Sequence, residues 1–193
     1  MILKRAVGVA LAWLLVLGLL VPSAATLAAG PVQQKEKEED EEEPKTEADK
    51  AKQKELEAKA CGPENVKHSA RTDKKQHPTP EPPADKALIY VLRPTMSGNK
   101  VQTKLGVDGK WMGVNRGDNY FFFTLEPGEH YFCSLAENKS VLALKVEAGK
   151  TYYLQQKIRF GWMKARNNLV LLDEAEGKAG LAKCHLALFE EKN

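Results

Sequence analysis

The chain has 193 residues, of which 42% are hydrophobic and 28% are charged, and its formal net charge is +3. This modestly basic balance falls short of the concentrated positive charge that a nucleic-acid-binding protein needs, although it would suit an anionic polymer of the cell envelope. The four histidines and three cysteines have none of the zinc-finger, zincin or CxxC spacings, so we expect no metal, no cofactor and no enzyme activity.

Residues 1–28 have the features of a bacterial signal peptide. Lys4 and Arg5 precede a long apolar run that ends at a proline and is followed by small residues. Cleavage after Ala25 or Ala28 would satisfy the small-x-small pattern, and Ala28 is preferred. The alternative is a retained signal anchor, because the run is almost long enough to span a bilayer. We expect cleavage and a periplasmic or secreted protein without a stable membrane span; no cysteine follows the small residues, so we expect no lipid anchor.

Residues 29–60 form an acidic segment with one leucine and no aromatic residue. Such a segment cannot offset the entropy of ordering by burying apolar surface. The Glu/Lys spacing of its second half supports a solvated, coiled-coil-like helix. We predict a disordered tail that grades into a transient helix without core contact and serves mainly as a solvated spacer. A tail that binds a cation or a partner is the alternative.

Residues 61–86 are predicted to be an extension that contains an edge strand at VKHSART and then a proline-rich connector biased to polyproline conformation. Three cysteines in an exported chain suggest one disulfide and one free thiol. We favour a Cys61–Cys133 disulfide, because it would tie down a stretch with little core of its own. Cys133–Cys184 is the runner-up, since both cysteines lie in predicted strands.

The sequence pattern of residues 87–190 predicts a single antiparallel β-sandwich with one short helix near the C-terminus, capped at Asp173. Short apolar runs are separated by turns at Asp108-Gly109, Pro127-Gly128 and Gly149, where glycine supplies the positive φ that such turns need. The resulting fold class is mostly β.

Two of these runs allow their faces to be assigned. The run YFFFTL, residues 120–125, is apolar on both faces, which favours an inner strand covered on both sides over an aromatic surface for a partner. In residues 141–146, Leu142, Leu144 and Val146 share a wholly apolar face, whereas the opposite face is mixed.

Three stretches, ALIYVLRP (87–94), VDGKWMGVNRGDNYFFFTLEPGEHYF (107–132) and VEAGKTYYLQQKI (146–158), resemble the bacterial domain-of-unknown-function family 2846. The resemblance covers about residues 87–173, and it implies a secreted or envelope protein with no assigned chemistry. The pattern is more loosely similar to PEGA-type domains and to transthyretin-like and immunoglobulin-like sandwiches. The residues that carry the resemblance are turn and core residues, namely Asp108, Gly109, Gly113, Tyr120, Pro127, Gly128, Gly149, Tyr152 and Tyr153.

The first function hypothesis is an exported, non-catalytic envelope module that binds a cell-wall polymer or a protein partner. Aromatic rings with a polar rim are common at such contacts, and Trp111, Arg116, Tyr120 and Trp162 are the candidate binding residues. The competing interpretation is that Trp111 and Trp162 simply pack the sandwich.

Two other function hypotheses remain open. One is a small thiol-dependent enzyme that uses Cys133 or Cys184 with a histidine. The other is a purely structural or assembly protein of the envelope, in which the acidic tail keeps the domain clear of the membrane surface.

Overall fold

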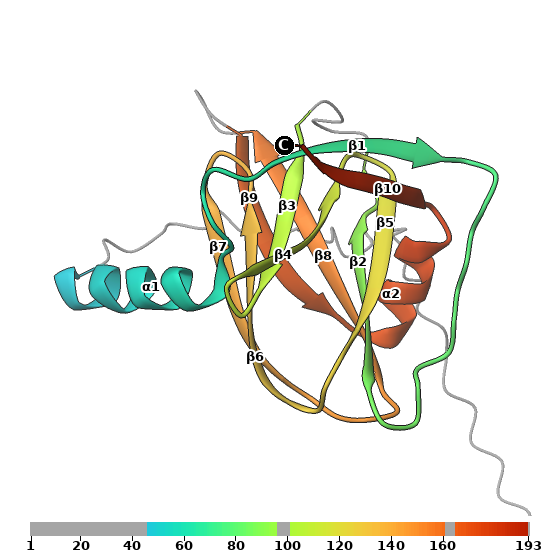
Figure 1. The fold of residues 1–193 in the computed structure, drawn as a ribbon, viewed down its shortest axis with the longest axis horizontal. Coiled ribbons are helices and arrows are strands. Elements are labelled where there is room, and N and C mark those ends of the chain that lie inside the picture. Colours follow the sequence, from blue (N-terminus) through green and yellow to red (C-terminus); the bar gives the residue numbers. More distant parts are fainter. Residues whose placement is uncertain (1–45, 96–100, 161–164, 193) are drawn as a thin grey trace, which may run out of the picture. The chain divides into compact units, whose positions relative to one another are not determined.

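The computed structural model describes residues 46–95, 101–160 and 165–192, which form ten strands and two helices (Figure 1). The expected signal peptide, most of the acidic tail and Trp162 lie outside these residues. Within the described part, no helix is both long and apolar enough to cross a membrane. The elements are α1 (Glu47–Ala60), β1 (Lys67–Asp73), β2 (Ala87–Arg93), β3 (Thr103–Val107), β4 (Lys110–Asn115), β5 (Asn119–Leu125), β6 (Gly128–Leu135), β7 (Lys139–Val146), β8 (Thr151–Phe160), β9 (Ala165–Leu172), α2 (Glu174–Leu181) and β10 (His185–Lys192).

The strands form two sheets. One has six strands in the order β1-β10-β5-β2-β8-β9, and the other has four in the order β4-β3-β6-β7. Buried apolar side chains from both sheets meet in one core cluster, whose members include Ile89, Val91, Leu105, Phe121, Phe132 and Leu154. The prediction of a mostly β, two-layered fold is therefore confirmed.

The prediction that all strand pairs are antiparallel is wrong for two pairs. β2 pairs in parallel with β8, with Ile89 opposite Tyr152, and β10 pairs in parallel with β5. After β2 the chain passes through five strands, four of them in the other sheet, before β8 returns beside β2. A connection of this length allows two neighbouring strands to run in the same direction, which a tight hairpin cannot do.

The three predicted turns lie where the sequence places them, but they connect different kinds of strand pairs. Asp108 and Gly109 have φ values of +49° and +81° and close the β3–β4 hairpin. The turns at Gly128 (φ +151°) and Gly149 (φ +70°) instead carry the chain from one sheet to the other, between β5 and β6 and between β7 and β8. Two of the three turns are thus corners of the sandwich.

The predicted strand faces are confirmed. In β5, Phe121 and Phe123 pack in the core between the sheets, and Tyr120 and Phe122 belong to an apolar cluster on the opposite face, so both faces of the strand are packed. In β7, Leu142 and Leu144 pack against the core and Val146 is buried, while Ala143 and Lys145 are exposed.

The acidic segment makes a contact that the sequence analysis did not expect. α1 begins with a capping box between Thr46 and Asp49 and reaches β6 and β7 with its last turn, where Ala60 is fully buried. The expectation of no core contact is therefore wrong for the end of this helix. The cause is the disulfide that follows at once, because Cys61 is bonded to Cys133 of β6.

The outer face of the six-stranded sheet carries a second apolar cluster under α2, whose members include Leu88, Tyr90, Leu92, Tyr120, Tyr153 and Leu181. The side chain of Asp173 caps α2, as predicted. The extension adds the predicted edge strand, since β1 pairs along its whole length with β10. The chain then crosses this face as a proline-rich segment before it enters β2 (Figure 1).

Candidate functional site

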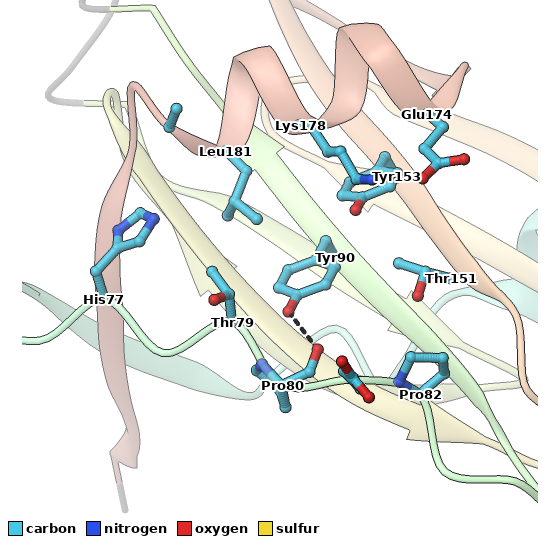
Figure 2. Close-up of a pocket in the computed structure, with 12 residues that line it drawn as sticks. His77, Thr79, Pro80, Pro82, Tyr90, Thr151, Tyr153, Glu174, Lys178 and Leu181 are labelled. Carbon is cyan, nitrogen blue, oxygen red and sulfur yellow. Dashed lines mark hydrogen bonds and ion pairs between the residues drawn. The ribbon is translucent and has the colours of Figure 1, made fainter.

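A cavity of about 370 Å³ lies between the proline-rich segment, the outer face of the six-stranded sheet and α2 (Figure 2). Its volume falls at the lower end of the range of ligand pockets, roughly 300–1,000 Å³. We call residues 77–82, which form one wall, the proline strap. β2 and β8 supply the floor through Tyr90, Thr151 and Tyr153. The other wall is α2, through Glu174, Lys178 and Leu181, together with Ala182 just after the helix.

Two tyrosine rings form the floor of the cavity. Tyr90 and Tyr153 lie directly opposite each other on the parallel strands β2 and β8, and their rings stack with centroids 5.4 Å apart and planes 10° apart. α2 lies against Tyr153 at Gly177, where an added Cβ atom would be 2.2 Å from the tyrosine Cγ. The floor is therefore apolar and held in place from both sides.

The proline strap is fastened to the sheet by tyrosine hydroxyl groups. Tyr120 donates to the carbonyl oxygen of Pro78 and Tyr90 to that of Pro80, both at 3.0 Å. Burial raises the pKa of both tyrosines to about 12, so each hydroxyl keeps its proton and remains a donor. Aromatic side chains that hold alternate carbonyls of an extended, proline-containing segment are also the means by which proteins recognise polyproline II peptides.

The rim of the cavity is polar. On α2, Lys178 and Glu174 form an exposed ion pair one turn apart, and Thr79 and Glu81 project from the strap. The rim thus offers hydroxyl, carboxylate and ammonium groups around an aromatic floor. This combination can hold a ligand that has both apolar faces and hydrogen-bonding groups.

The structure does not bring the predicted binding residues together. Trp111 packs outside the four-stranded sheet, where its Nε1 donates to the carbonyl oxygen of Pro63 at 2.8 Å and its ring leaves no room for a Cβ atom at Gly62. Tyr120 is fully buried outside the six-stranded sheet. One ligand cannot touch both residues, and these contacts favour the packing interpretation for Trp111.

The other two predicted residues add little to a common site. Arg116 is half-buried in the connection between β4 and β5, and its Nε atom is buried without a hydrogen-bond partner among the described residues. Trp162 lies outside the described residues. The predicted contribution of Arg116 to partner binding stays a prediction.

Sequence reasoning missed the cavity because its parts are far apart in the chain. Tyr90 and Tyr153 are both apparent as strand residues, and Pro78 and Pro80 show the two-residue spacing of the strap. The sequence offers one signal of the cavity. Tyr90 shares a strand face with two leucines, and such an apolar face must be covered by another segment of the chain. Nothing in the sequence indicates that β8 pairs with β2 and sets Tyr153 beside Tyr90.

The cysteines occupy two kinds of environment. Cys61 and Cys133 form the favoured disulfide, and Cys184 is a buried free thiol. Burial raises the pKa of the Cys184 thiol to about 12, which is the opposite of what a nucleophilic thiolate needs. Across the described ranges, no three histidine, cysteine or acidic side chains are grouped so that they could hold a metal ion.

Comparison with known proteins gives a family without an assigned function. Residues 83–168 match the family described as "Protein of unknown function (DUF2846)", which confirms the resemblance. An uncharacterized protein of Haemophilus influenzae is 32% identical over 101 residues, a match that spans 52% of this chain and 60% of that protein. No solved structure matches the chain. The looser similarity to PEGA-type, transthyretin-like and immunoglobulin-like domains is not confirmed.

The matched region contains only part of the cavity. Tyr90, Thr151 and Tyr153 on the floor lie inside residues 83–168, whereas the proline strap and α2 lie outside them. The walls of the cavity are thus built by segments that flank the family match.

Proposed function

We propose that this chain, whose residues 83–168 match the DUF2846 family, is an exported, non-catalytic module of the cell envelope that binds a cell-wall polymer in the cavity under the proline strap. The observation that carries the proposal is the stacked pair Tyr90 and Tyr153 inside a polar rim. The apolar face of a sugar ring packs on aromatic rings, while its hydroxyl groups bond to carboxylate, hydroxyl and ammonium groups of the kind found on this rim.

An envelope location is supported by the disulfide between Cys61 and Cys133. Disulfides form and persist in oxidising compartments such as the periplasm and the extracellular space. The signal-peptide features of residues 1–28 point to the same compartment.

A protein partner is the second candidate ligand, and the proline strap itself favours it. Tyr90 and Tyr120 already hold the carbonyl groups of Pro80 and Pro78 in the manner of a bound peptide. An extended, proline-containing segment of another protein would present the same acceptors to the same face.

The thiol-enzyme alternative is weaker. Cys133 has no thiol while it is bonded to Cys61, and the Cys184 thiol is buried with a raised pKa. A purely structural role in the envelope remains the alternative to binding, and it predicts that the cavity has no ligand.

The test uses a pair of matched substitutions on α2 and the residue that follows it. Ala182 lines the cavity, whereas Ala179 is exposed on the same helix and does not. Ala182→Trp should fill the mouth of the cavity and lower binding to purified peptidoglycan, measured by co-sedimentation, at least tenfold. Ala179→Trp should bind as the unsubstituted protein does.

The competing outcomes are separable in the same assay. If a synthetic peptide with the sequence of residues 75–84 binds and the peptidoglycan does not, the partner is a protein. If the unsubstituted protein binds neither the peptidoglycan nor the peptide, or if both tryptophan variants bind alike, the cavity is not the binding site. Either result would favour the purely structural role.

A further inference from the structure

Three tyrosines lie side by side across the outer face of the six-stranded sheet. Tyr120, Tyr90 and Tyr153 belong to β5, β2 and β8, which are consecutive strands of this sheet. All three side chains belong to the apolar cluster on that face. The ring centroids of Tyr120 and Tyr90 are 6.3 Å apart, and those of Tyr90 and Tyr153 are 5.4 Å apart. We call these three residues the tyrosine row.

Two hydroxyl groups of the tyrosine row have partners in the described part of the chain, and the third does not. Tyr120 and Tyr90 donate to the carbonyl oxygens of Pro78 and Pro80. The Tyr153 hydroxyl makes no hydrogen bond to any described residue, although Tyr153 is only 6% exposed. Buried polar groups are normally hydrogen-bonded. Tyr153 lines the cavity beside Tyr90, and its hydroxyl points toward the side of the proline strap, where a ligand can reach it (Figure 2).

The free hydroxyl of Tyr153 requires an uncharged acceptor. Burial raises the pKa of Tyr153, so the hydroxyl keeps its proton at neutral pH and can donate it in a hydrogen bond. The charges of the cavity disfavour an anionic acceptor. Glu174 and Lys178 form an ion pair, and Glu81 adds a carboxylate that has no ion-pair partner among the described residues. The group that fits is therefore a neutral carbonyl, the same group that the proline strap offers to the other two tyrosines.

The number of free donors separates two sources of such a carbonyl. An extended peptide is held through alternate backbone carbonyls, as the proline strap is held by Tyr120 and Tyr90. Only Tyr153 of the tyrosine row is free to donate to a ligand. One donor suits a carbonyl on a short side branch, such as the acetamido group of an amino sugar. The methyl group of that branch would find apolar contacts at Pro82 and Leu181, on opposite walls of the cavity.

We propose that the cavity binds an N-acetylated amino-sugar polymer, with the hydroxyl of Tyr153 donating to the carbonyl oxygen of an acetamido group. The inference rests on the proposed binding of a cell-wall polymer in this cavity, and it specifies the class of polymer. Thr79 and Thr151 line the same space and supply hydroxyl groups for the sugar ring. Tyr153 thus discriminates against a sugar that has a hydroxyl group in place of the acetamido group, because such a sugar extends no carbonyl oxygen away from its ring.

The experiment measures binding of the protein to two hexasaccharides by isothermal titration calorimetry. One is the β-linked hexamer of N-acetylglucosamine, and the other is the β-linked hexamer of glucose, which has hydroxyl groups in place of the acetamido groups. Tyr153→Phe removes the free hydroxyl and keeps the ring. Tyr152→Phe is the matched control, because Tyr152 is the preceding residue of β8, packs on the core side of the sheet and does not line the cavity.

We expect the unsubstituted protein to bind the N-acetylglucosamine hexamer about tenfold more tightly than the glucose hexamer. Tyr153→Phe should weaken binding of the N-acetylglucosamine hexamer about fivefold, the effect of one neutral hydrogen bond, and should leave binding of the glucose hexamer within about twofold. Tyr152→Phe should change neither affinity. The unfolding free energy of Tyr153→Phe should match that of the unsubstituted protein, since the hydroxyl bonds to no described residue, and this measurement separates a loss of binding from a loss of fold.

Two results would overturn the acetamido assignment. The first is equal binding, or no binding, of both hexamers by the unsubstituted protein, and the second is a Tyr153→Phe variant that keeps the full preference. If Ala182→Trp still loses peptidoglycan binding in either case, the cavity remains the binding site and only the class of polymer is wrong. If neither hexamer binds and Tyr153→Phe instead weakens binding of the peptide of residues 75–84, the carbonyl comes from a protein partner and the assignment also fails. Absence of all binding, to peptidoglycan included, would overturn the proposed function itself.

Discussion

At the scale of single residues, His130 joins two turns that are distant in sequence. Its Nδ1 lies 2.6 Å from Oδ2 of Asp108 in the β3–β4 turn, and its Nε2 lies 2.8 Å from the carbonyl oxygen of Glu126 before the β5–β6 corner. Both ring nitrogens thus face acceptors, and only the protonated ring can donate to both. The other carboxylate oxygen of Asp108 accepts from the backbone N–H of Tyr131, which holds the acceptor in place.

This geometry makes the stability of the protein depend on pH. Burial lowers the pKa of His130, but the hydrogen bonds to Asp108 and to the Glu126 carbonyl, together with the Asp108 charge, outweigh burial and leave the pKa raised. A histidine whose pKa is raised on folding stabilises the protein fully below its unfolded pKa of about 6.5 and loses that contribution as pH rises through the folded pKa. Relative to His130→Gln, the unsubstituted protein should therefore lose unfolding free energy as pH rises from about 6.5 through the raised pKa of His130.

Urea unfolding of both proteins across this pH range is the measurement. His68 is a useful contrast, because burial and the nearby charge of Lys104 lower its pKa. Relative to His68→Gln, the unsubstituted protein should lose stability as pH falls below about 6.5, the opposite sign. Superimposable pH profiles for the unsubstituted protein and His130→Gln would contradict the assignment.

At the scale of elements, α2 carries two glycines that have different roles. A Cβ atom at Gly177 would lie 2.2 Å from Cγ of Tyr153, whereas at Gly180 the nearest atom would be Cδ1 of Leu92, at 3.3 Å. Gly177 lets the helix approach the stacked tyrosines. The neighbour of Gly180 is the end of a flexible leucine side chain, which can move to make room for a methyl group. Close approach of α2 is therefore a requirement at one position of the helix and not at the other.

We expect Gly177→Ala to lower the unfolding free energy by about 1–3 kcal/mol through overpacking, although alanine is the better helix former by about 1 kcal/mol. Gly180→Ala should be neutral or slightly stabilising for the same reason of helix propensity. Thermal and urea unfolding of the two variants provide the comparison. A Gly177→Ala protein as stable as Gly180→Ala would show that α2 does not pack on Tyr153 as described.

At the scale of the whole molecule, the extension covers the sandwich on both outer faces. Residues near Cys61 lie over the four-stranded sheet. They approach it closely, because a Cβ atom added at Gly106 would be only 2.9 Å from the carbonyl oxygen of Ala60. The proline strap then covers the tyrosines of the six-stranded sheet. The disulfide between Cys61 and Cys133 fixes the start of this path and closes a loop with a sequence separation of 72.

Removal of this disulfide should have a large effect on stability. In the chain-entropy account, a closed loop of this length stabilises by about 4 kcal/mol. Cys61→Ala/Cys133→Ala should lose about that amount in urea unfolding, and the reduced unsubstituted protein should agree with it to within about 1 kcal/mol. A loss below about 1 kcal/mol would mean that α1 and the extension are held by packing alone.

Particular elements show how far sequence reasoning reached in the candidate site. Asp173 as a helix cap and residues 67–73 as an edge strand were predictable, because a cap and a short polar strand have local signatures. The cavity was not, because its floor joins residues 63 positions apart, at Tyr90 and Tyr153, on strands whose parallel pairing has no local signature. Trp111 and Tyr120 looked alike as aromatic residues near turns, yet Trp111 is half-buried beside Pro63 on one sheet and Tyr120 is fully buried beneath Pro78 on the other.

The amino-acid sequence by itself determined where the strands begin and end, which positions turn and which strand faces are apolar. These properties depend on backbone sterics and on side-chain alternation within a few residues, as at Asp108-Gly109 and in β7. Only the tertiary structure decided which strands share a sheet, that β8 runs parallel to β2, and that the proline strap and α2 enclose a cavity. Those outcomes depend on contacts between distant segments, whose free energy exists only once the whole chain has folded.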